Sequence, residues 1–291
     1  MHLESIARVP LSEFQPPMLS GQPCVLFDDK DYWKTLRQWQ PDYLKQAAGE
    51  NEVYVRETHG APQNIFQNLR EGGRIPFADY LDWVLDAAGR LGNIARSERS
   101  PAEISRAIIE TQIDHSYYLD ANLGTLSQQL LREAPAPPWY NSSPLDINLW
   151  CGIVGTSSGL HFDVTPNCNL QVSGEKHFTL FSPSQSRFLY RVPGITHGSF
   201  DPNLPDFDRY PLAKEARGVA CRLQPGECLY IPVGWFHQVT VVSAWALNVN
   251  FFWARPRLQT VQHPRIWPFL MRKTRAKLRM LRAPEAAQRT Q

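Results

Sequence analysis

Hydrophobic residues are spaced differently in the two halves of the chain, and the change falls near residue 146. In the first half they recur every three or four positions, which is typical of amphipathic helices. We expect helices over 31–49, 77–91 and 123–133, with Pro41 dividing the first into two short helices. A short strand, VYVRET, is expected from Val53. The first half is therefore predicted to be mainly helical, with a few strands.

From residue 146 onward the chain consists of short apolar runs of four to eight residues, separated by Gly, Pro, Ser and Asn. This is the pattern of strands joined by turns. Seven such runs with no long helix between them predict an antiparallel sandwich or barrel of the jelly-roll kind. After Trp253 the steps of three and four return and predict a helix over 267–282. The runs are INLWCGIV, GLHFD, NLQVSG, KHFTLFS, GECLYIP, FHQVTVV and ALNVNFFW.

Composition limits the classes of protein to which the chain can belong. Hydrophobic residues make up 43% and charged residues 20% of its 291 positions, a balance typical of a folded globular protein. No apolar run approaches the roughly 18 residues that span a bilayer, and the first residues lack the apolar core of a signal peptide. The five cysteines show no two-residue spacing typical of zinc or redox motifs, so buried free thiols are expected. We therefore expect a cytoplasmic protein without a membrane span.

Charge is distributed unevenly along the chain. Residues 255–291 contain ten basic side chains and one acidic side chain, although the net charge of the whole chain is only +2, so the body before this tail is acidic. Such a tail can contact a nucleic acid, an anionic membrane face or an acidic partner, and it can equally be the solvated face of a helix. The apolar stripe over 267–282 is too small to be stable alone, so we expect this helix to dock on its own barrel or on a partner chain.

Two histidines and one aspartate in the strand-rich half have the chemistry of a metal site. His161 and Asp163 flank Phe162, and because side chains alternate along a strand they point to the same face. A turn through Gly234 brings His237 to the start of another strand, which a barrel can place beside the first. Two histidines and a carboxylate form the facial triad of non-haem Fe(II) oxygenases, which leaves open positions on the metal. The other histidines lack this context and are expected on the surface or in the core: His2, His59, His115, His177, His197 and His263.

A lysine is predicted on the interior face of the barrel. Lys176 shares a strand face with two apolar residues, where a charge is expensive to bury unless it is paired. A dicarboxylate co-substrate that chelates the metal would supply the pair, with the hydroxyl group of Ser158 on the same carboxylate. The alternative is a lysine at a strand end that reaches solvent. On the last strand Asn248 and Asn250 share one face, which suits a wet active site or a pair of core amides bonded to the backbone.

Three segments carry the pattern of a known family: GLHFDVTPNCNLQVSGEKHFTLFSP, ECLYIPVGWFHQVTVV and ALNVNFFW. They resemble the JmjC family of Fe(II)- and 2-oxoglutarate-dependent oxygenases. Within it the chain is most similar to the small cupin-like protein hydroxylases related to the hypoxia-pathway asparaginyl hydroxylase. The family lysine stands fifteen residues after the first histidine of the His-x-Asp pair, as Lys176 follows His161. The resemblance runs from about Ile6 to Trp253.

The resemblance assigns further residues to the co-substrate site. The family places a Thr or Ser three residues before the first histidine, where Ser158 stands, and an Asn six residues after it, where Asn167 stands. An Asn in the last barrel strand is matched by Asn250. The family's Tyr-Leu-Gln motif is similar to the three residues from Tyr118, although the third is Asp instead of Gln. The resemblance implies that His161, Asp163 and His237 bind Fe(II), and that 2-oxoglutarate contacts Lys176, Ser158, Tyr118, Asn167 and Asn250.

The fold that the resemblance implies is mainly β with flanking helices. Its core is a cupin-like double-stranded β-helix, or jelly roll, over 141–254. From the sequence pattern we expect a helical or mixed N-terminal region over 1–140 to pack on this barrel, and a basic helical tail, which lies beyond the resemblance, over 255–291. The implied activity consumes O2 and 2-oxoglutarate, releases succinate and CO2, and hydroxylates a side chain of a protein, a peptide or a smaller amino-acid-like molecule.

An alternative is a non-enzymatic cupin that keeps the fold and the metal site as a sensor or an interaction scaffold. The three ligand positions and the lysine position are all filled, which favours the enzyme. The sequence leaves hydroxylation and demethylation open, and the basic tail leaves a tRNA or ribosomal substrate open. Hydroxylases of this kind dimerise through C-terminal helices, so a homodimer is also expected.

Overall fold

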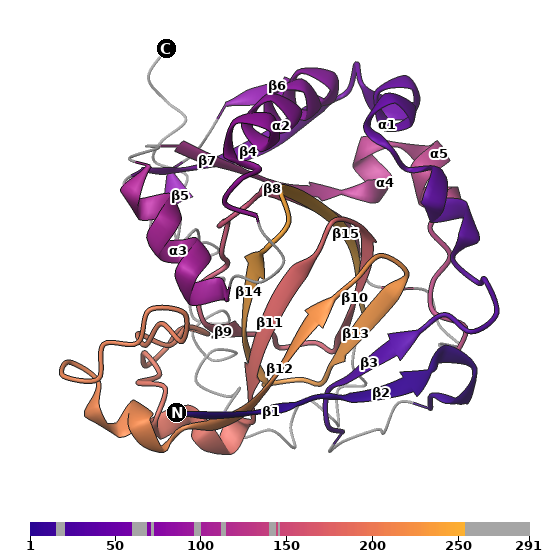
Figure 1. The fold of residues 1–291 in the computed structure, drawn as a ribbon. Helices are drawn as coiled ribbons and strands as arrows, with labels where there is room; N and C mark the ends of the chain where they lie inside the picture. Colours follow the sequence, from indigo (N-terminus) through magenta and orange to yellow (C-terminus); the bar gives the residue numbers. More distant parts are fainter. Residues whose placement is uncertain are drawn as a thin grey trace, which may run out of the picture.

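Two β-sheets that face each other form the centre of the molecule, and helices cover one of them (Figure 1). The computed structural model of the chain describes residues 1–15, 21–59, 69–70, 73–95, 100–111, 115–139, 144 and 146–253. The smaller sheet contains, in spatial order, β1 (His2–Ser5), β12 (Arg217–Leu223), β11 (Lys176–Phe181), β14 (Phe236–Val241) and β9 (His161–Phe162). The larger sheet contains β2 (Ala7–Pro10), β3 (Cys24–Phe27), β13 (Glu227–Ile231), β10 (Asn167–Ser173), β15 (Trp245–Phe252), β8 (Asp146–Ile153), β7 (His115–Asn122), β4 (Glu52–His59) and β5 (Leu69–Arg70), with β6 (Arg74–Pro76) paired to β4.

From β8 onward the chain passes repeatedly from one sheet to the other, which is the path of a jelly roll. The connections β8–β9, β10–β11, β12–β13 and β14–β15 each cross between the sheets. Neighbouring strands of this core run antiparallel. Each of the seven apolar runs coincides with one of these strands. The architecture therefore agrees with the predicted jelly-roll core.

The turn between β10 and β11 decides where Lys176 enters the fold. Gly174 in this turn has a φ of +65°, a left-handed conformation that residues with a Cβ atom rarely adopt. A Cβ atom there would lie 2.0 Å from the carbonyl oxygen of Trp245, so only glycine fits. The turn carries the chain from the larger sheet into the smaller one and makes Lys176 the first residue of β11.

Helices pack on the outer face of the larger sheet, away from the barrel interior (Figure 1). The predicted helix 77–91 is α2 (Phe77–Leu91), and its Tyr80 packs in one apolar cluster with Leu149 of β8 and Val249 of β15. The hydroxyl group of Tyr80 also donates to the carbonyl oxygen of Cys151 at 2.9 Å. The spacing of three and four places Leu85 on the same side of this helix as the buried apolar residues. The side chain of Leu85 is nevertheless 36% exposed. The other α-helices of the described residues are α1 (Pro41–Ala48), α3 (Pro101–Glu110), α4 (Leu123–Leu126) and α5 (Gln128–Glu133), and there are also short 3₁₀ helices, among them Lys34–Gln38 before α1.

The space between the two sheets is partly apolar and partly polar. Its apolar part joins residues of β11 and β12 to residues of β3 and β13, and all of the side chains at its centre are buried. The polar part contains a lysine, a histidine and several amides on β10, β11, β14 and β15. The apolar part therefore closes one region of the barrel, and the polar part marks the region where a ligand can bind. Among the buried polar residues of these four strands are Asn167, Asn169, Gln171, Lys176, His237, Asn248 and Asn250.

The first half of the chain contains more strands than the sequence predicted. β1 runs parallel to β12, while β2 and β3 extend one edge of the larger sheet and β7 and β4 extend the other. The strands β1, β2 and β3 have only four residues each, so their alternation is too short to recognise. The helix α3 was not predicted either, although Ser100 and Glu103 form a capping box at its start.

Three further predictions concern cysteines, membranes and the tail. All five cysteines are buried and free, as predicted. In the described part of the chain no helix has the length and apolar character that crossing a bilayer requires. The predicted C-terminal helix and the basic tail over 255–291 lie outside the described residues.

Candidate functional site

Pairing between β9 and β14 places the two predicted metal-binding histidines side by side. His161 is the register partner of His237, and the centres of their rings lie 4.3 Å apart. Asp163 follows the end of β9, so it is not a strand residue as predicted; its carboxylate nevertheless lies 3.6 Å from Nε2 of His237. One ligand atom from each of the three residues lies within 4.8 Å of the others. No other group of three or more His, Cys, Asp or Glu side chains in the described residues is close enough to share a metal ion.

The two imidazole rings are held so that the same nitrogen of each can bind a metal. Nδ1 of His161 lies 3.0 Å from the carbonyl oxygen of Gly159, and Nδ1 of His237 lies 3.0 Å from that of Trp235. Because a carbonyl oxygen only accepts, Nδ1 carries the proton and Nε2 keeps its lone pair. Burial, with a smaller contribution from the neighbouring His237, lowers the pKa of His161 to about 4, so its ring is neutral at pH 7.

A chain of two amides holds the carboxylate of Asp163. Nδ2 of Asn167 donates to Oδ2 of Asp163 at 2.6 Å, and Nδ2 of Asn169 donates to Oδ1 of Asn167 at 2.6 Å. Both asparagines lie on the inner face of β10 and are buried. Asn167 therefore contacts the metal ligand Asp163. The three residues His161, Asp163 and His237 are called the metal end of the site below.

Lys176 lies in the barrel interior with 1% of its surface exposed, which excludes the alternative of a lysine that reaches solvent. Its ammonium group donates to Oδ1 of Asn248, and Nδ2 of Asn248 donates to Oδ1 of Asn250. The ammonium nitrogen also lies 5.9 Å from the centre of the Tyr118 ring. Burial lowers the pKa of Lys176 to about 7. Lys176, Asn248 and Tyr118 are called the lysine end of the site.

One cavity of about 230 Å³ connects the metal end with the lysine end. Residues of both sheets line it, so the jelly-roll path is what brings them together. The hydroxyl group of Ser158 accepts the backbone N–H of Val239 at 3.0 Å and donates to the carbonyl oxygen of Gly159 at 3.1 Å. The cavity is lined by Tyr118, Trp150, Ser158, His161, Asp163, Asn169, Lys176, Thr196, His197, His237, Val239, Asn248, Asn250 and Phe252. All of the predicted site residues except Asn167 are in this set.

The sequence analysis missed some residues of the cavity wall. His197 was expected on the surface or in the core, but it pairs with His161 in an isolated β-bridge and its ring centre lies 5.9 Å from that of His161. Thr196 and Trp150 also line the cavity, as does Asn169. Asn169 begins the predicted run NLQVSG, and alternation from Asn167 two residues earlier could have indicated that the two side chains share a face. No local pattern indicates His197, because it lies in an irregular segment outside the named strands.

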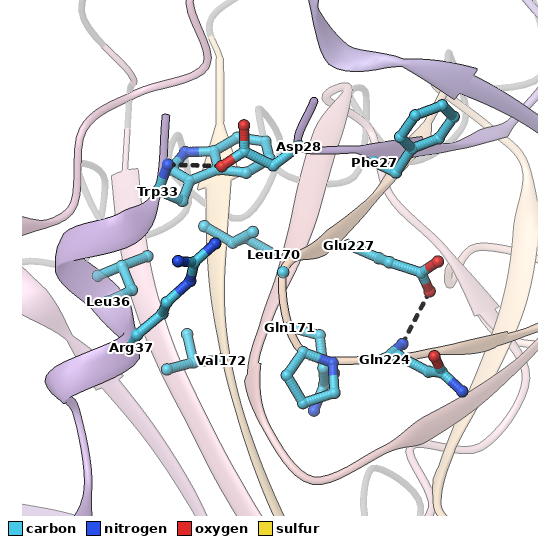
Figure 2. Close-up of a pocket in the computed structure, with 12 residues that line it drawn as sticks. Phe27, Asp28, Trp33, Leu36, Arg37, Leu170, Gln171, Val172, Gln224 and Glu227 are labelled. Carbon is cyan, nitrogen blue, oxygen red and sulfur yellow. Dashed lines mark hydrogen bonds between the residues drawn. The ribbon is translucent and has the colours of Figure 1, made fainter. Parts of the chain in front are cut away.

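A larger cavity lies on the outside of the barrel, between the segment 27–37 and the strand β10 (Figure 2). Its volume is about 510 Å³. Its charged groups already have partners: Asp28 accepts the backbone N–H of Trp33 at 2.8 Å, and Glu227 accepts that of Gln224 at 2.9 Å. Arg37 takes part in an exposed ion pair. The cavity therefore lacks converging ligand atoms, and the smaller cavity between the sheets is the candidate active site.

Comparisons with known proteins show the family of the chain. The chain is 27% identical over 280 residues to the Homo sapiens bifunctional peptidase and (3S)-lysyl hydroxylase JMJD7, covering 84% of this chain and 81% of that protein. It is 41% identical over 237 residues to the Mus musculus tRNA wybutosine-synthesizing protein 5, covering 80% and 71%. It is 26% identical over 257 residues to the Arabidopsis thaliana lysine-specific demethylase JMJ31, covering 81% and 46%. A family model described as a cupin-like domain matches residues 10–258, and the chain belongs to this family of cupin-like, JmjC-type oxygenases.

Proposed function

We propose that the protein is an Fe(II)- and 2-oxoglutarate-dependent hydroxylase that acts on a side chain of a protein, a peptide or an amino-acid-like molecule. The observation that carries the proposal is a single cavity with a metal-ligand set at one end and a buried lysine at the other. A ligand that is both a metal chelator and an anion at its far end suits such a cavity. The carboxylate and keto oxygens of 2-oxoglutarate give the chelating end, and its second carboxylate gives the anionic end.

The donor atoms at the metal end fit Fe(II). His161 and His237 offer Nε2 as the ligand atom, because each ring is fixed through Nδ1, and Asp163 offers a carboxylate oxygen. Two imidazoles and one carboxylate leave open positions on the metal for a chelating co-substrate and for O2. Asn167 holds the carboxylate of Asp163 from behind, an arrangement that orients a metal ligand and raises its affinity.

The lysine end fits the second carboxylate of 2-oxoglutarate. Lys176 supplies the opposite charge in a buried setting, where a charge-assisted hydrogen bond is strong. The hydroxyl hydrogen of Ser158, which now points to a carbonyl oxygen, can turn toward a carboxylate in the cavity. Tyr118 and Asn250 border the same space. The triad thus orients one end of the co-substrate, and these side chains orient the other and exclude water from it.

Bound iron supplies the oxidising chemistry: one atom of O2 enters a C–H bond of the substrate, and the other enters the succinate formed with CO2 from 2-oxoglutarate. The protein's part is to hold both carboxylates and to place the substrate next to the metal. His161 is neutral at pH 7, and both histidines keep the lone pair of Nε2 on the metal side because Nδ1 of each ring donates to a backbone carbonyl group. Trp150, Val239 and Phe252 contribute apolar surface to the cavity, against which a substrate side chain can pack.

A second candidate substrate is a modified nucleoside of tRNA. The 41% identity over 80% of the chain to a tRNA wybutosine-synthesizing protein favours it. The name of the human relative, a (3S)-lysyl hydroxylase, favours a protein side chain. The reaction chemistry is the same in both cases, and only the molecule that reaches the metal differs.

The test combines a co-substrate assay with a search for the product. Purified protein with Fe(II), ascorbate and 2-oxoglutarate should form succinate, and Asp163→Ala should not. Native peptides and total tRNA are then incubated separately, and mass spectrometry maps single-oxygen additions that require both Fe(II) and 2-oxoglutarate. Absence of succinate formation with either pool would favour the non-enzymatic scaffold and contradict the proposal.

A further inference from the structure

The polar group that holds Lys176 is neutral. A buried lysine is ordinarily paired with a carboxylate, because an isolated charge is expensive to take out of water. In the described part of the chain no Asp or Glu side chain forms an ion pair with Lys176, and the acceptor of its ammonium group is the amide oxygen of Asn248. The other titratable neighbours are Tyr118, whose ring lies beneath the ammonium group, and the buried thiol of Cys151. The charge of Lys176 is therefore oriented but not neutralised.

We infer that Asn248 is a positioning residue for the co-substrate: it holds the ammonium group of Lys176 in place and leaves its charge for an anion that enters the cavity. This inference rests on the proposed function and names a residue on which the 2-oxoglutarate site depends. Asn248 acts through Lys176. An amide oxygen is polar enough to fix the ammonium group and too weakly charged to replace a carboxylate.

The direction of the hydrogen bonds keeps the oxygen of Asn248 turned toward Lys176. Nδ2 of Asn248 donates to Oδ1 of Asn250, so its other end must be the acceptor. Asn248 and Asn250 alternate with apolar residues on β15 and share its inner face. β15 pairs on one side with β10 and on the other with β8. A central strand with two neighbours is rigid, so the acceptor stays in place before the co-substrate arrives.

An aspartate at position 248 would have nearly the same shape as Asn248 but would neutralise the charge of Lys176. Its carboxylate would form an internal ion pair with Lys176 and compete with the distal carboxylate of 2-oxoglutarate. A leucine of similar volume would remove the acceptor without adding charge. The two substitutions should therefore both weaken 2-oxoglutarate binding but should shift the pKa of Lys176 in opposite directions. A role in packing alone would not produce that pair of results.

The experiment measures 2-oxoglutarate binding by calorimetry to the full chain loaded with Mn(II), which binds without turnover, for wild type, Asn248→Asp and Asn248→Leu. We expect Asn248→Asp to weaken binding by about 30-fold or more, the lower range for disturbing a buried charge pair. We expect Asn248→Leu to weaken it by roughly 10-fold, the typical effect of losing a group that orients a binding residue. The Mn(II) affinity should stay within about 3-fold of wild type in both, because the metal end keeps its own hydrogen-bond partners.

A second measurement follows the pKa of Lys176 in the metal-free protein, by NMR of protein that contains ¹³C-labelled, unmodified lysine. Asn248→Asp should raise this pKa and Asn248→Leu should lower it. Asn203→Asp is the matched control, because Asn203 is an equally buried amide that contacts Thr240 outside the cavity. It should leave both the affinity for 2-oxoglutarate and the pKa of Lys176 unchanged.

Two results would overturn the role of Asn248: wild-type affinity for 2-oxoglutarate in Asn248→Leu, or a shift of the Lys176 pKa in the same direction in both variants. If Asn248→Asp does not fold, the affinity and the pKa of Asn248→Leu alone decide the question. Failure of the wild-type protein to bind 2-oxoglutarate would instead contradict the proposed function. The two failures are therefore distinguishable.

Discussion

The metal end and the lysine end of the cavity differ in exposure and in how their side chains are held. The side chain of Asp163 is 26% exposed, whereas Lys176 is 1% exposed. At the metal end, backbone carbonyl groups accept from Nδ1 of the two histidines, which leaves the lone pairs of their Nε2 atoms for a cation. The amide of Asn167 donates to the carboxylate of Asp163. At the lysine end, a neutral amide accepts from the ammonium group and leaves its positive charge in place.

One fold thus prepares the two ends of a single cavity for opposite charges, a metal cation at one end and a carboxylate at the other. At the two histidines the lone pair of Nε2 is kept for a metal because Nδ1 donates to a backbone carbonyl group, and at Asp163 the amide of Asn167 holds the carboxylate. A buried positive charge is harder to keep, because burial favours its neutral form. It lies on strands in the barrel interior, where a carboxylate that enters the cavity would favour its protonated form.

The largest effect is expected from Asp163→Ala. Removing the only carboxylate of the triad should abolish succinate formation and lower the affinity for Fe(II) by more than about 100-fold, since even loss of a partner behind a metal ligand costs 10- to 100-fold. Anaerobic titration with Fe(II) and 2-oxoglutarate, read from the visible absorption of the chelate, measures the loss. An unchanged absorption band in this variant would remove Asp163 from the metal site.

The next largest effect is expected from Lys176→Met, which separates function from stability. Losing the charge partner of the distal carboxylate should weaken 2-oxoglutarate binding by about 2–5 kcal/mol. The same change replaces a buried charge by an apolar side chain of similar length, so the free energy of unfolding should rise by about 1 kcal/mol or more. Calorimetry and urea denaturation measure the two quantities. A variant that loses both binding and stability would show that Lys176 is required for packing.

Asn167→Ala distinguishes two roles for this residue. The resemblance to the family predicts contact with 2-oxoglutarate, whereas in the structure Asn167 donates to Asp163. If it acts through Asp163, the affinity for Fe(II) should fall by about 10- to 100-fold, and 2-oxoglutarate should bind normally once the metal is saturating. Calorimetry at low and at saturating metal compares these cases. Weaker 2-oxoglutarate binding at saturating metal would favour direct contact.

The sequence predicted the strands and the metal ligands better than the surroundings of the site. His161 and His237 were found because their segments carry strong strand and turn signals, and in the structure the two strands pair directly. The partner of Lys176 was not predicted, because nothing in the chain order of β11 and β15 says that these two side chains meet. His197 was missed because an irregular segment has no periodicity from which its position follows. Pairing across the barrel, which local patterns do not encode, decides both contacts.

The smallest expected effect is a pH dependence of stability that arises at the lysine end alone. The pKa of Lys176 is about 7 in the folded protein because of burial, compared with its ordinary value of 10.5. Between these values the unfolded chain holds a proton that the folded chain has lost, so the free energy of unfolding should increase with pH, by at most about 1.4 kcal/mol per pH unit. Urea denaturation of the metal-free protein between pH 7 and about 8.5 measures this increase.

This pH interval separates Lys176 from the other buried groups. Burial lowers the pKa values of several histidines, His161 among them, to about 4, so their contribution to the pH dependence is complete near their ordinary value of 6.5. Burial raises the pKa of thiols such as that of Cys24 to about 12, so they reduce stability only as pH passes their ordinary value of 9.0. Lys176→Met should therefore give a flat profile in this interval, and Asp163→Ala, at the metal end, should keep the increase. If the free energy of unfolding of Lys176→Met still increases with pH in this interval, another group causes the increase. The lysine end would then lack the unneutralised charge that distinguishes it from the metal end.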